Sequence, residues 1–218
     1  MIASSIPSPT VSEFFVRVQR QDGPGRPSYW ERFRVPYESD MNVISVLQRI
    51  AQQATTADGR HVAPVAWECN CLEEVCGSCT MVINGRVRQA CSALVARLLA
   101  ERPQEIELRP MSKFPVVRDL LVDRERMFET LKMIKAWVPV DSYLHLGSGQ
   151  RQSQETQQLA YQYSKCMTCG CCLEACPQYL KLELSREKGE SDEQFAAREN
   201  EAFNRAFIGA MGIATVDL

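Results

Sequence analysis

The chain has 218 residues, 45% of them hydrophobic, and a formal net charge of -2 from 25 basic and 27 acidic side chains. This length allows one or two domains with buried cores, and we expect two. The near balance of charge gives no field that would gather nucleic acid, so no nucleic-acid partner is expected. No apolar run approaches the roughly 18 residues of a spanning helix, and no export signal opens the chain, which predicts a soluble protein in a reducing compartment.

The first predicted elements are a hairpin and a covering helix. Branched and aromatic residues mix with charges over 14–20 and 30–37, on either side of a Gly-Pro-Gly turn at 23–25, which predicts two paired strands. Asn42 can cap a helix whose apolar residues share one face: Val43, Ile44, Val46, Leu47 and Ile50. We expect this helix to cover the sheet that the hairpin opens.

Further short strands are expected before residue 110. One is predicted around 65–67, ahead of a cysteine loop. The dipeptide Asn84-Gly85 is a strong hairpin signal between strands at 80–83 and 87–90. Residues 106–108 could add a last strand.

The first cysteine group lies around this hairpin. Cys71, Cys76 and Cys79 have the spacing C-x4-C-x2-C, and Cys91 follows across the turn. This is the plant-type ferredoxin arrangement, in which a loop gives three thiolates to a [2Fe–2S] cluster and a returning strand gives the fourth. A four-thiolate zinc site or buried unligated thiols are the alternatives, but zinc favours short cysteine pairs.

After Asp123 the pattern becomes helical. Apolar residues recur at helical spacing: Met127, Phe128, Leu131, Ile134 and Trp137. A polar stretch at 147–155 precedes further expected helices at 156–164 and 192–207. We therefore expect an α+β fold with a sheet domain over residues 1–110 and a helical domain over residues 111–218.

The second cysteine group lies in this helical half. Cys166, Cys169, Cys172 and Cys176 give C-x2-C-x2-C-x3-C, and Pro177 follows at once. This is the bacterial ferredoxin run, in which three thiolates hold three corners of a cubane and the fourth ligates a neighbouring cluster. Chance or a zinc site is the alternative.

The remaining cysteines and the two histidines carry weaker signals. Cys69 and Cys171 fall outside both spacings, and we expect them to be packed side chains rather than extra ligands. His61 and His145 lie far from both cysteine groups in the sequence, and we expect them at the surface or capped.

Two other segments contain candidate functional residues. Arg118, Asp119 and Asp123 could dock a partner protein or could form a solvated connection between domains. The Gly-Ser-Gly segment at 147–149 lacks the glycine spacing of a dinucleotide loop, so no flavin or nicotinamide site is expected.

The two cysteine groups, in this order, resemble the iron–sulfur subunit of succinate dehydrogenase and fumarate reductase. The resemblance extends beyond the cysteines to four stretches: residues 71–79, 81–91, 114–120 and 164–169. It covers about 14–177, and the form is closer to the menaquinone-linked bacterial enzymes.

The resemblance implies an N-terminal β-grasp ferredoxin-like domain with a [2Fe–2S] cluster, followed by an α-helical bacterial-ferredoxin-like domain with [4Fe–4S] and [3Fe–4S] clusters. It assigns ligands to each cluster in turn: Cys71, Cys76, Cys79 and Cys91 to the first; Cys166, Cys169 and Cys172 to the second; and Cys176 to the third. It implies no catalytic residue in this chain.

The role that the resemblance implies is electron transfer within a larger complex of the tricarboxylic acid cycle. The expected partners are a flavoprotein subunit carrying FAD, a membrane-anchor cytochrome b subunit and a quinone, menaquinone by the closer match. The expected location is peripheral, on the cytoplasmic side of the bacterial inner membrane. A free-standing soluble ferredoxin-like carrier and a zinc-stabilised interaction module are the rival functions.

One departure from the family concerns the end of the chain. The family continues with a further cysteine group that completes the last two clusters, whereas this sequence stops at Leu218. The [4Fe–4S] cluster then lacks one ligand and the [3Fe–4S] cluster all but one. We expect a truncated form whose gene continues with three more cysteines.

Overall fold

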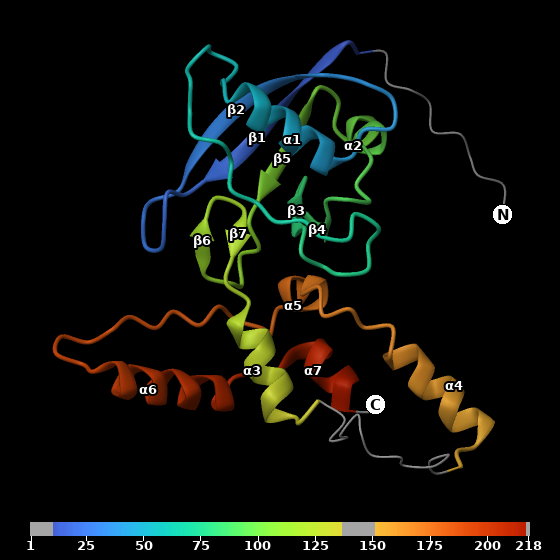
Figure 1. The fold of residues 1–218 in the computed structure, drawn as a ribbon, viewed down its shortest axis with the longest axis vertical. Coiled ribbons are helices and arrows are strands. Elements are labelled where there is room, and N and C mark those ends of the chain that lie inside the picture. Colours follow the sequence, from blue (N-terminus) through green and yellow to red (C-terminus); the bar gives the residue numbers. More distant parts are fainter. Residues whose placement is uncertain (1–10, 137–150, 217–218) are drawn as a thin grey trace, which may run out of the picture. The chain divides into compact units, whose positions relative to one another are not determined.

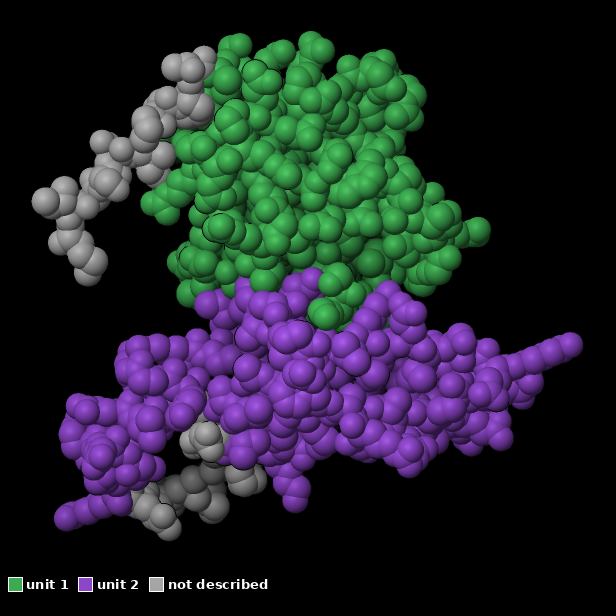
Figure 2. Space-filling view, turned by 180° about the vertical axis from the view of Figure 1, so that it is seen from behind, with its two compact units in different colours: residues 1–123 green, residues 124–218 purple. Residues whose placement is uncertain are grey.

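The computed structural model describes residues 11–136 and 151–216 (Figure 1). The chain divides into two compact units, residues 1–123 and 124–218 (Figure 2). Within the described residues, every strand belongs to the first unit, and the second unit is helical, so the predicted α+β class is confirmed. The units divide after Asp123, and the division into domains over residues 1–110 and 111–218 stays a prediction.

The first unit is built on a five-stranded sheet with the order β2-β1-β5-β3-β4. The two predicted hairpins are confirmed, β1 (Glu13–Arg20) with β2 (Tyr29–Pro36), and β3 (Thr80–Ile83) with β4 (Arg86–Gln89). The predicted last strand is β5 (Glu105–Arg109), which lies in the middle of the sheet, parallel to β1 and antiparallel to β3.

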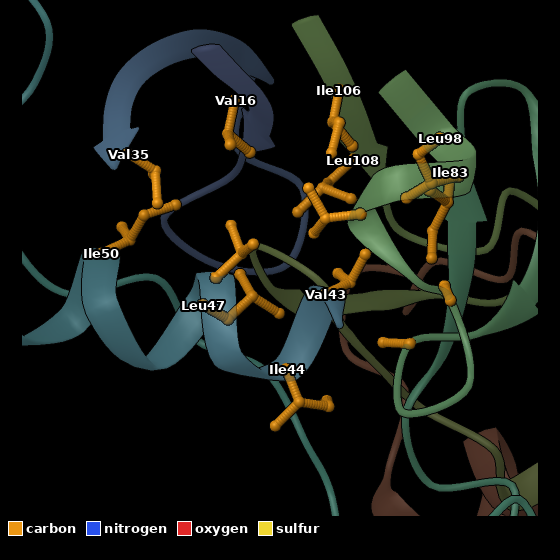
Figure 3. Packing of buried hydrophobic residues seen from close by; sticks show 14 of the residues in the cluster. Val16, Val35, Val43, Ile44, Leu47, Ile50, Ile83, Leu98, Ile106 and Leu108 are labelled. Atoms are coloured by element: carbon orange, nitrogen blue, oxygen red, sulfur yellow. The ribbon is translucent and has the colours of Figure 1, made fainter. Parts of the chain in front are cut away.

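Helix α1 (Val43–Gln53) packs its apolar face on this sheet, as predicted. Asn42 is the N-cap, and its Oδ1 accepts the Ser45 N–H at 3.0 Å. Figure 3 shows the shared core, which holds α1 residues together with strand residues such as Val16, Ile106 and Leu108. The short helix α2 (Val95–Glu101), which the sequence analysis missed, adds Leu98 to the core.

The predicted strand at 65–67 is wrong. Val65 is buried, but residues 65–67 form no strand. Their backbone hydrogen bonds go to a side chain and to a turn. Ala66 N–H donates to Asp119 Oδ2 at 2.8 Å, and Leu120 N–H donates to Ala66 O at 3.1 Å. Asp119 sits at the turn between β6 (Val116–Arg118) and β7 (Leu121–Val122), a small hairpin that closes the first unit.

The second unit contains the helices α3 (Glu125–Met133), α4 (Gln154–Tyr163), α5 (Cys171–Ala175), α6 (Asp192–Arg205) and α7 (Gly209–Val216). The predicted helices are confirmed as α3, α4 and α6, while Trp137 and residues 147–150 lie outside the described residues. Helix α5 contacts α7, and α3 contacts both α6 and α7. In the described part of the chain no helix is long and apolar enough to cross a membrane.

Candidate metal centres

The first cysteine group gathers at one end of the sheet of the first unit. Cys71 and Cys76 lie half-buried in the loop before β3, and Cys79 is buried directly before that strand. Cys91 is buried just after β4. The β3–β4 hairpin therefore returns the fourth cysteine to the loop that holds the other three. The hairpin signal at Asn84-Gly85 predicted this return.

The loop backbone directs its N–H groups at sulfur. Leu72 and Glu74 have φ angles of 63° and 61°, in the left-handed region that few residues with side chains adopt. The N–H groups of Glu73 and Val75 then donate to Cys71 Sγ at 3.5 and 3.4 Å. Successive N–H groups turned inward in this way form an anion-binding concavity, which suits the negative charge of thiolates.

Cys76 and Cys71 interact through a hydrogen bond, not through a disulfide. Cys71 N–H donates to Cys76 Sγ at 3.5 Å, and the Ser78 hydroxyl lies 3.5 Å from the same sulfur. The hydrogen bond with Ser78, followed by those with the N–H groups of Cys71 and Ser78, lowers the pKa of Cys76 to about 6. This thiol therefore loses its proton readily, which thiolate ligation requires.

Cys91 and Cys79 interact through a hydrogen bond between their thiols. Burial raises the pKa of Cys91 to about 11, and the hydrogen bond with the Cys79 thiol adds to this effect. The Glu74 N–H acts in the opposite direction, while the charges of Cys79 and Cys71 raise the pKa further. All four thiols are thus linked, because Cys71 interacts with both pairs.

The four cysteines fit a [2Fe–2S] cluster. Among the described residues, no group of three or more His, Cys, Asp or Glu side chains is placed to hold a single metal ion. A two-iron cluster needs a different pattern, in which two thiolates bind each iron and sulfide bridges the irons. The pairs Cys71 with Cys76 and Cys79 with Cys91 have this pattern, and the inward N–H groups would stabilise the anionic cluster.

Cys69 differs from the expectation. The sequence predicted a packed side chain at the end of a strand, but Cys69 is exposed and no strand precedes it. The prediction is wrong because the segment before the loop bonds to the Asp119 carboxylate and forms no strand. No sulfur contact of Cys69 links it to the ligand pairs within the described residues.

Asn42 connects the covering helix to the fourth cysteine, a link that the sequence did not indicate. Its Oδ1 caps α1, and its Nδ2 donates to Cys91 O at 2.9 Å. One side chain therefore fixes both the start of the helix and the backbone of Cys91.

Asn42→Ala should lower the free energy of unfolding by about 1–2 kcal/mol, because the helix loses its cap and the Cys91 carbonyl loses a donor. Asn42→Asp is the matched control, since it keeps the cap acceptor and loses only the donor. Urea unfolding measures both variants. An equal loss in the two would show that the cap contributes nothing.

The second cysteine group surrounds α5 in the second unit. Cys166 is exposed, in a turn where its N–H donates to Tyr163 O at 3.0 Å, and Cys169 is half-buried. Cys172 is exposed as a residue, but its thiol is partly desolvated. This desolvation raises the pKa of Cys172, and the charges of Cys169 and Cys166 raise it further. Cys176 lies at the other end of α5, as its C-cap.

Helix α7 packs directly on this group. The Met211 N–H donates toward Cys172 and partly offsets the rise in its pKa. Gly209 allows the close approach, because an added Cβ would lie 2.2 Å from Leu173 Cδ2 and 3.2 Å from Tyr179 Cδ2. Leu173 and Tyr179 are fully buried, so neither side chain can yield without loss of packing. Cys171 is half-buried at the start of α5.

Gly209→Ala should detach α7 from α5 and lower the stability of the second unit by about 2 kcal/mol or more, from backbone strain plus overpacking. Gly189→Ala is the control, because Gly189 also has a positive φ (87°) but nothing within 4 Å of an added Cβ. Thermal unfolding compares the two. Equal shifts in Tm would show that the loss of stability comes from backbone strain at a positive φ alone, and not from the clash with Leu173 and Tyr179.

Asp119 is a structural residue of the first unit, not part of a solvated connection. It is 0% exposed, and its Oδ1 accepts Arg20 Nε–H at 2.8 Å and Gln21 N–H at 3.1 Å. Arg20 is 2% exposed and also donates to buried Glu31 at 2.6 Å and to Ala63 O at 3.1 Å. Burial alone would lower the pKa of Arg20, but the hydrogen bond and charge of Asp119, with the charge of Glu31, raise it above its ordinary value.

The other candidates lie at the surface or outside the described residues. His61 is exposed, as predicted, with Nδ1 3.3 Å from Thr55 Oγ1. Arg118 and Asp123 are exposed too. His145 and the segment 147–149 lie outside the described residues, so their expected roles stay predictions.

The sheet order, the covering helix and the cysteine loop define the first unit as a plant-type ferredoxin-like domain. The sequence profile of the family described as "2Fe-2S iron-sulfur cluster binding domain" matches residues 15–129. The chain belongs to this family, and its relatives are iron–sulfur subunits of succinate dehydrogenase and fumarate reductase.

Three relatives illustrate the similarity. The succinate dehydrogenase iron–sulfur subunit of Bacillus subtilis is 52% identical over 160 residues, 73% of this chain and 62% of that protein. The fumarate reductase iron–sulfur subunit of Haemophilus influenzae is 27% identical over 158 residues, 67% of this chain and 57% of that protein. A chain of the Mycobacterium smegmatis Sdh1 complex in the apo form shares the fold, with a TM-score of 0.66 at 23% identity, over 95% of this chain and 75% of that one. The chain thus spans less than two thirds of the length of these two curated relatives.

Proposed function

We propose that the chain is the iron–sulfur electron-transfer subunit of a succinate dehydrogenase or a fumarate reductase, with no substrate turnover of its own. The observation that carries the proposal is the gathering of Cys71, Cys76, Cys79 and Cys91 at one end of a ferredoxin-like sheet, with inward N–H groups around them. The second run of cysteines and the 52% identity to the Bacillus subtilis subunit support it.

The proposed ligands follow the two cysteine groups. The first four cysteines would hold a [2Fe–2S] cluster, Cys166, Cys169 and Cys172 three corners of a [4Fe–4S] cluster, and Cys176 would bind a [3Fe–4S] cluster. When bound, each cluster takes up and releases single electrons. The protein contributes burial of Cys79 and Cys91 and the N–H groups of the loop, which together set the potential of the first site.

The proposed partners are those of a membrane-bound complex. A flavoprotein subunit with FAD would exchange electrons with succinate or fumarate. A cytochrome b anchor would bring the chain to a quinone, menaquinone by the resemblance of the sequence to the menaquinone-linked bacterial enzymes. The location would be peripheral, on the cytoplasmic side of the bacterial inner membrane.

A tagged chain purified from its host in mild detergent tests this proposal. We expect a flavin-containing subunit to copurify. Succinate should reduce the iron–sulfur clusters, which paramagnetic resonance (EPR) spectra would show as the appearance of the signal of the reduced [2Fe–2S] cluster. A loaded chain that carries no flavin subunit and does not respond to succinate would contradict the proposal and favour the free-standing carrier.

A further inference from the structure

Glu107 of β5 lies on the face of the sheet that is turned away from the core. Its neighbours Ile106 and Leu108 point into the core (Figure 3), and side chains alternate along a strand, so Glu107 points to the opposite face. The side chain of Glu107 is only 11% exposed. Its carboxylate contacts the guanidinium groups of three arginines, which are Arg17 of β1, Arg102 at the end of α2 and Arg109 of β5.

The three arginines bring more positive charge than Glu107 neutralises. Arg109 Nε lies 3.1 Å from Glu107 Oε1, Arg102 Nη1 lies 3.9 Å from Oε2, and Arg17 donates a hydrogen bond to Oε2. Within the part of the chain that the structure describes, none of the three arginines forms an ion pair with a second acid. Three cations against one anion leave two positive charges, on side chains that are 42%, 53% and 41% exposed.

Hydrogen-bond donors around Glu107 outnumber their acceptors. Asn84 Oδ1 accepts the Glu107 N–H at 2.8 Å, which holds this side chain beside β5, but Asn84 Nδ2 is buried and has no acceptor among the described residues. The Nε groups of Arg17 and Arg109 are also buried without a hydrogen bond, because Arg109 Nε–H does not point at the nearby carboxylate oxygen. A buried donor without an acceptor costs free energy, so an anion that bonded to these groups would stabilise the fold.

The neighbouring strand β2 adds to the positive potential and orients one of the arginines. Arg17 Cζ lies 4.4 Å from the centroid of the Trp30 ring, and Trp30 is 44% exposed. A guanidinium group stacked on a ring keeps the N–H groups at its edge available for an oxyanion in the same plane. Arg32, which pairs with Glu105, lies directly opposite Arg17, and like charges in this position repel each other.

We propose that Arg17, Arg102 and Arg109 form an oxyanion-binding site, the arginine site, which takes a doubly charged oxyanion such as a phosphate group or a dicarboxylate. Two negative charges would neutralise the excess, and guanidinium groups bind both kinds of anion through paired hydrogen bonds. The half-exposed arginine side chains can rotate toward a ligand that enters from solvent. The site needs no iron–sulfur cluster, so it does not depend on the proposed function.

Calorimetric titration of the full chain tests the arginine site, with inorganic phosphate and succinate as probes and with chloride used to keep the ionic strength constant. We expect one doubly charged anion to bind per chain. Binding of phosphate alone would identify a phosphate group as the ligand, and binding of succinate alone would identify a dicarboxylate. Binding of both would show that the site selects for double charge, and binding of neither would overturn the proposal.

Substitutions locate the binding. Arg17→Gln and Arg102→Gln should each weaken it about tenfold or more, because each removes one charged donor group. Glu107→Gln should strengthen it, because the carboxylate that competes for the arginines becomes neutral. Arg49→Gln is the matched control, since Arg49 of α1 pairs with exposed Glu38 alone, and its loss should leave the affinity unchanged.

Nuclear magnetic resonance of the nitrogen-labelled full chain shows where the anion binds and whether each variant is folded. Titration should shift the Nε–H signals of Arg17 and Arg109 and the side-chain amide signals of Asn84, while the signal of Arg49 stays in place. Arg102 is more than half exposed, so Arg102→Gln tests the site with little effect on folding. Equal affinities in wild type, Arg17→Gln and Arg102→Gln, or shifts confined to other residues, would overturn the arginine site.

Discussion

Asp119→Ala is expected to lower the free energy of unfolding of the first unit by about 3–5 kcal/mol, because removing one member of a buried ion pair leaves a buried charge without compensation. Arg20 would keep Glu31 but would lose the acceptor of its Nε–H. Ala66 N–H and Gln21 N–H would lose their acceptor at the same time. The segment that leads into the cysteine loop would then be released, so cluster loss should accompany unfolding.

Urea unfolding, followed by circular dichroism and by cluster absorbance, measures this effect. Asp58→Ala is the matched control, because Asp58 accepts from Arg60 at 2.9 Å but its side chain is 64% exposed. Exposed pairs of this kind contribute little, so a much smaller change in the free energy of unfolding is expected for Asp58→Ala than for Asp119→Ala. Equal losses in the two variants would show that burial of the Asp119 network is unimportant.

Replacing any one of Cys71, Cys76, Cys79 and Cys91 with serine is expected to abolish or strongly destabilise the proposed two-iron cluster. In the proposed assignment two thiolates bind each iron, so each substitution would leave one iron short of a thiolate ligand. Cys69→Ser and Cys171→Ser are the controls. Cys69 is exposed two residues before the first ligand, and Cys171 belongs to the other unit. Iron and sulfide analysis after anaerobic reconstitution measures the result, and the ligand assignment fails if Cys69→Ser loses the cluster while Cys91→Ser keeps it.

The local parts of the fold were predictable from the sequence. Asn84 and Gly85 both have positive φ angles, 50° and 79°, as the turn between β3 and β4 requires, and both residues tolerate them. Asn42 and the apolar spacing after it predicted α1 for an equally local reason. The cysteine spacings predicted which thiols the fold of the first unit would gather.

The parts that depend on distant partners were not predictable. Arg20 and Asp119 are 99 positions apart in the sequence, so no pattern around either one indicates the pair. One signal near Asp119 could have indicated a buried charge. Arg118 and Asp119 interrupt an otherwise apolar stretch at 116–122. The same carboxylate explains why the strand at 65–67 is absent, since a side chain replaces the strand partner that the pattern implied.

The EPR spectrum of the dithionite-reduced chain, in a variant with Cys166, Cys169, Cys172 and Cys176 all changed to serine, shows whether the first cysteine group holds a [2Fe–2S] cluster. That variant leaves only the first cysteine group to bind iron. We expect the signal of one reduced [2Fe–2S] cluster, with about two iron and two sulfide per chain, and no signal before reduction. A colourless protein that holds zinc and gives no signal after reduction would contradict it.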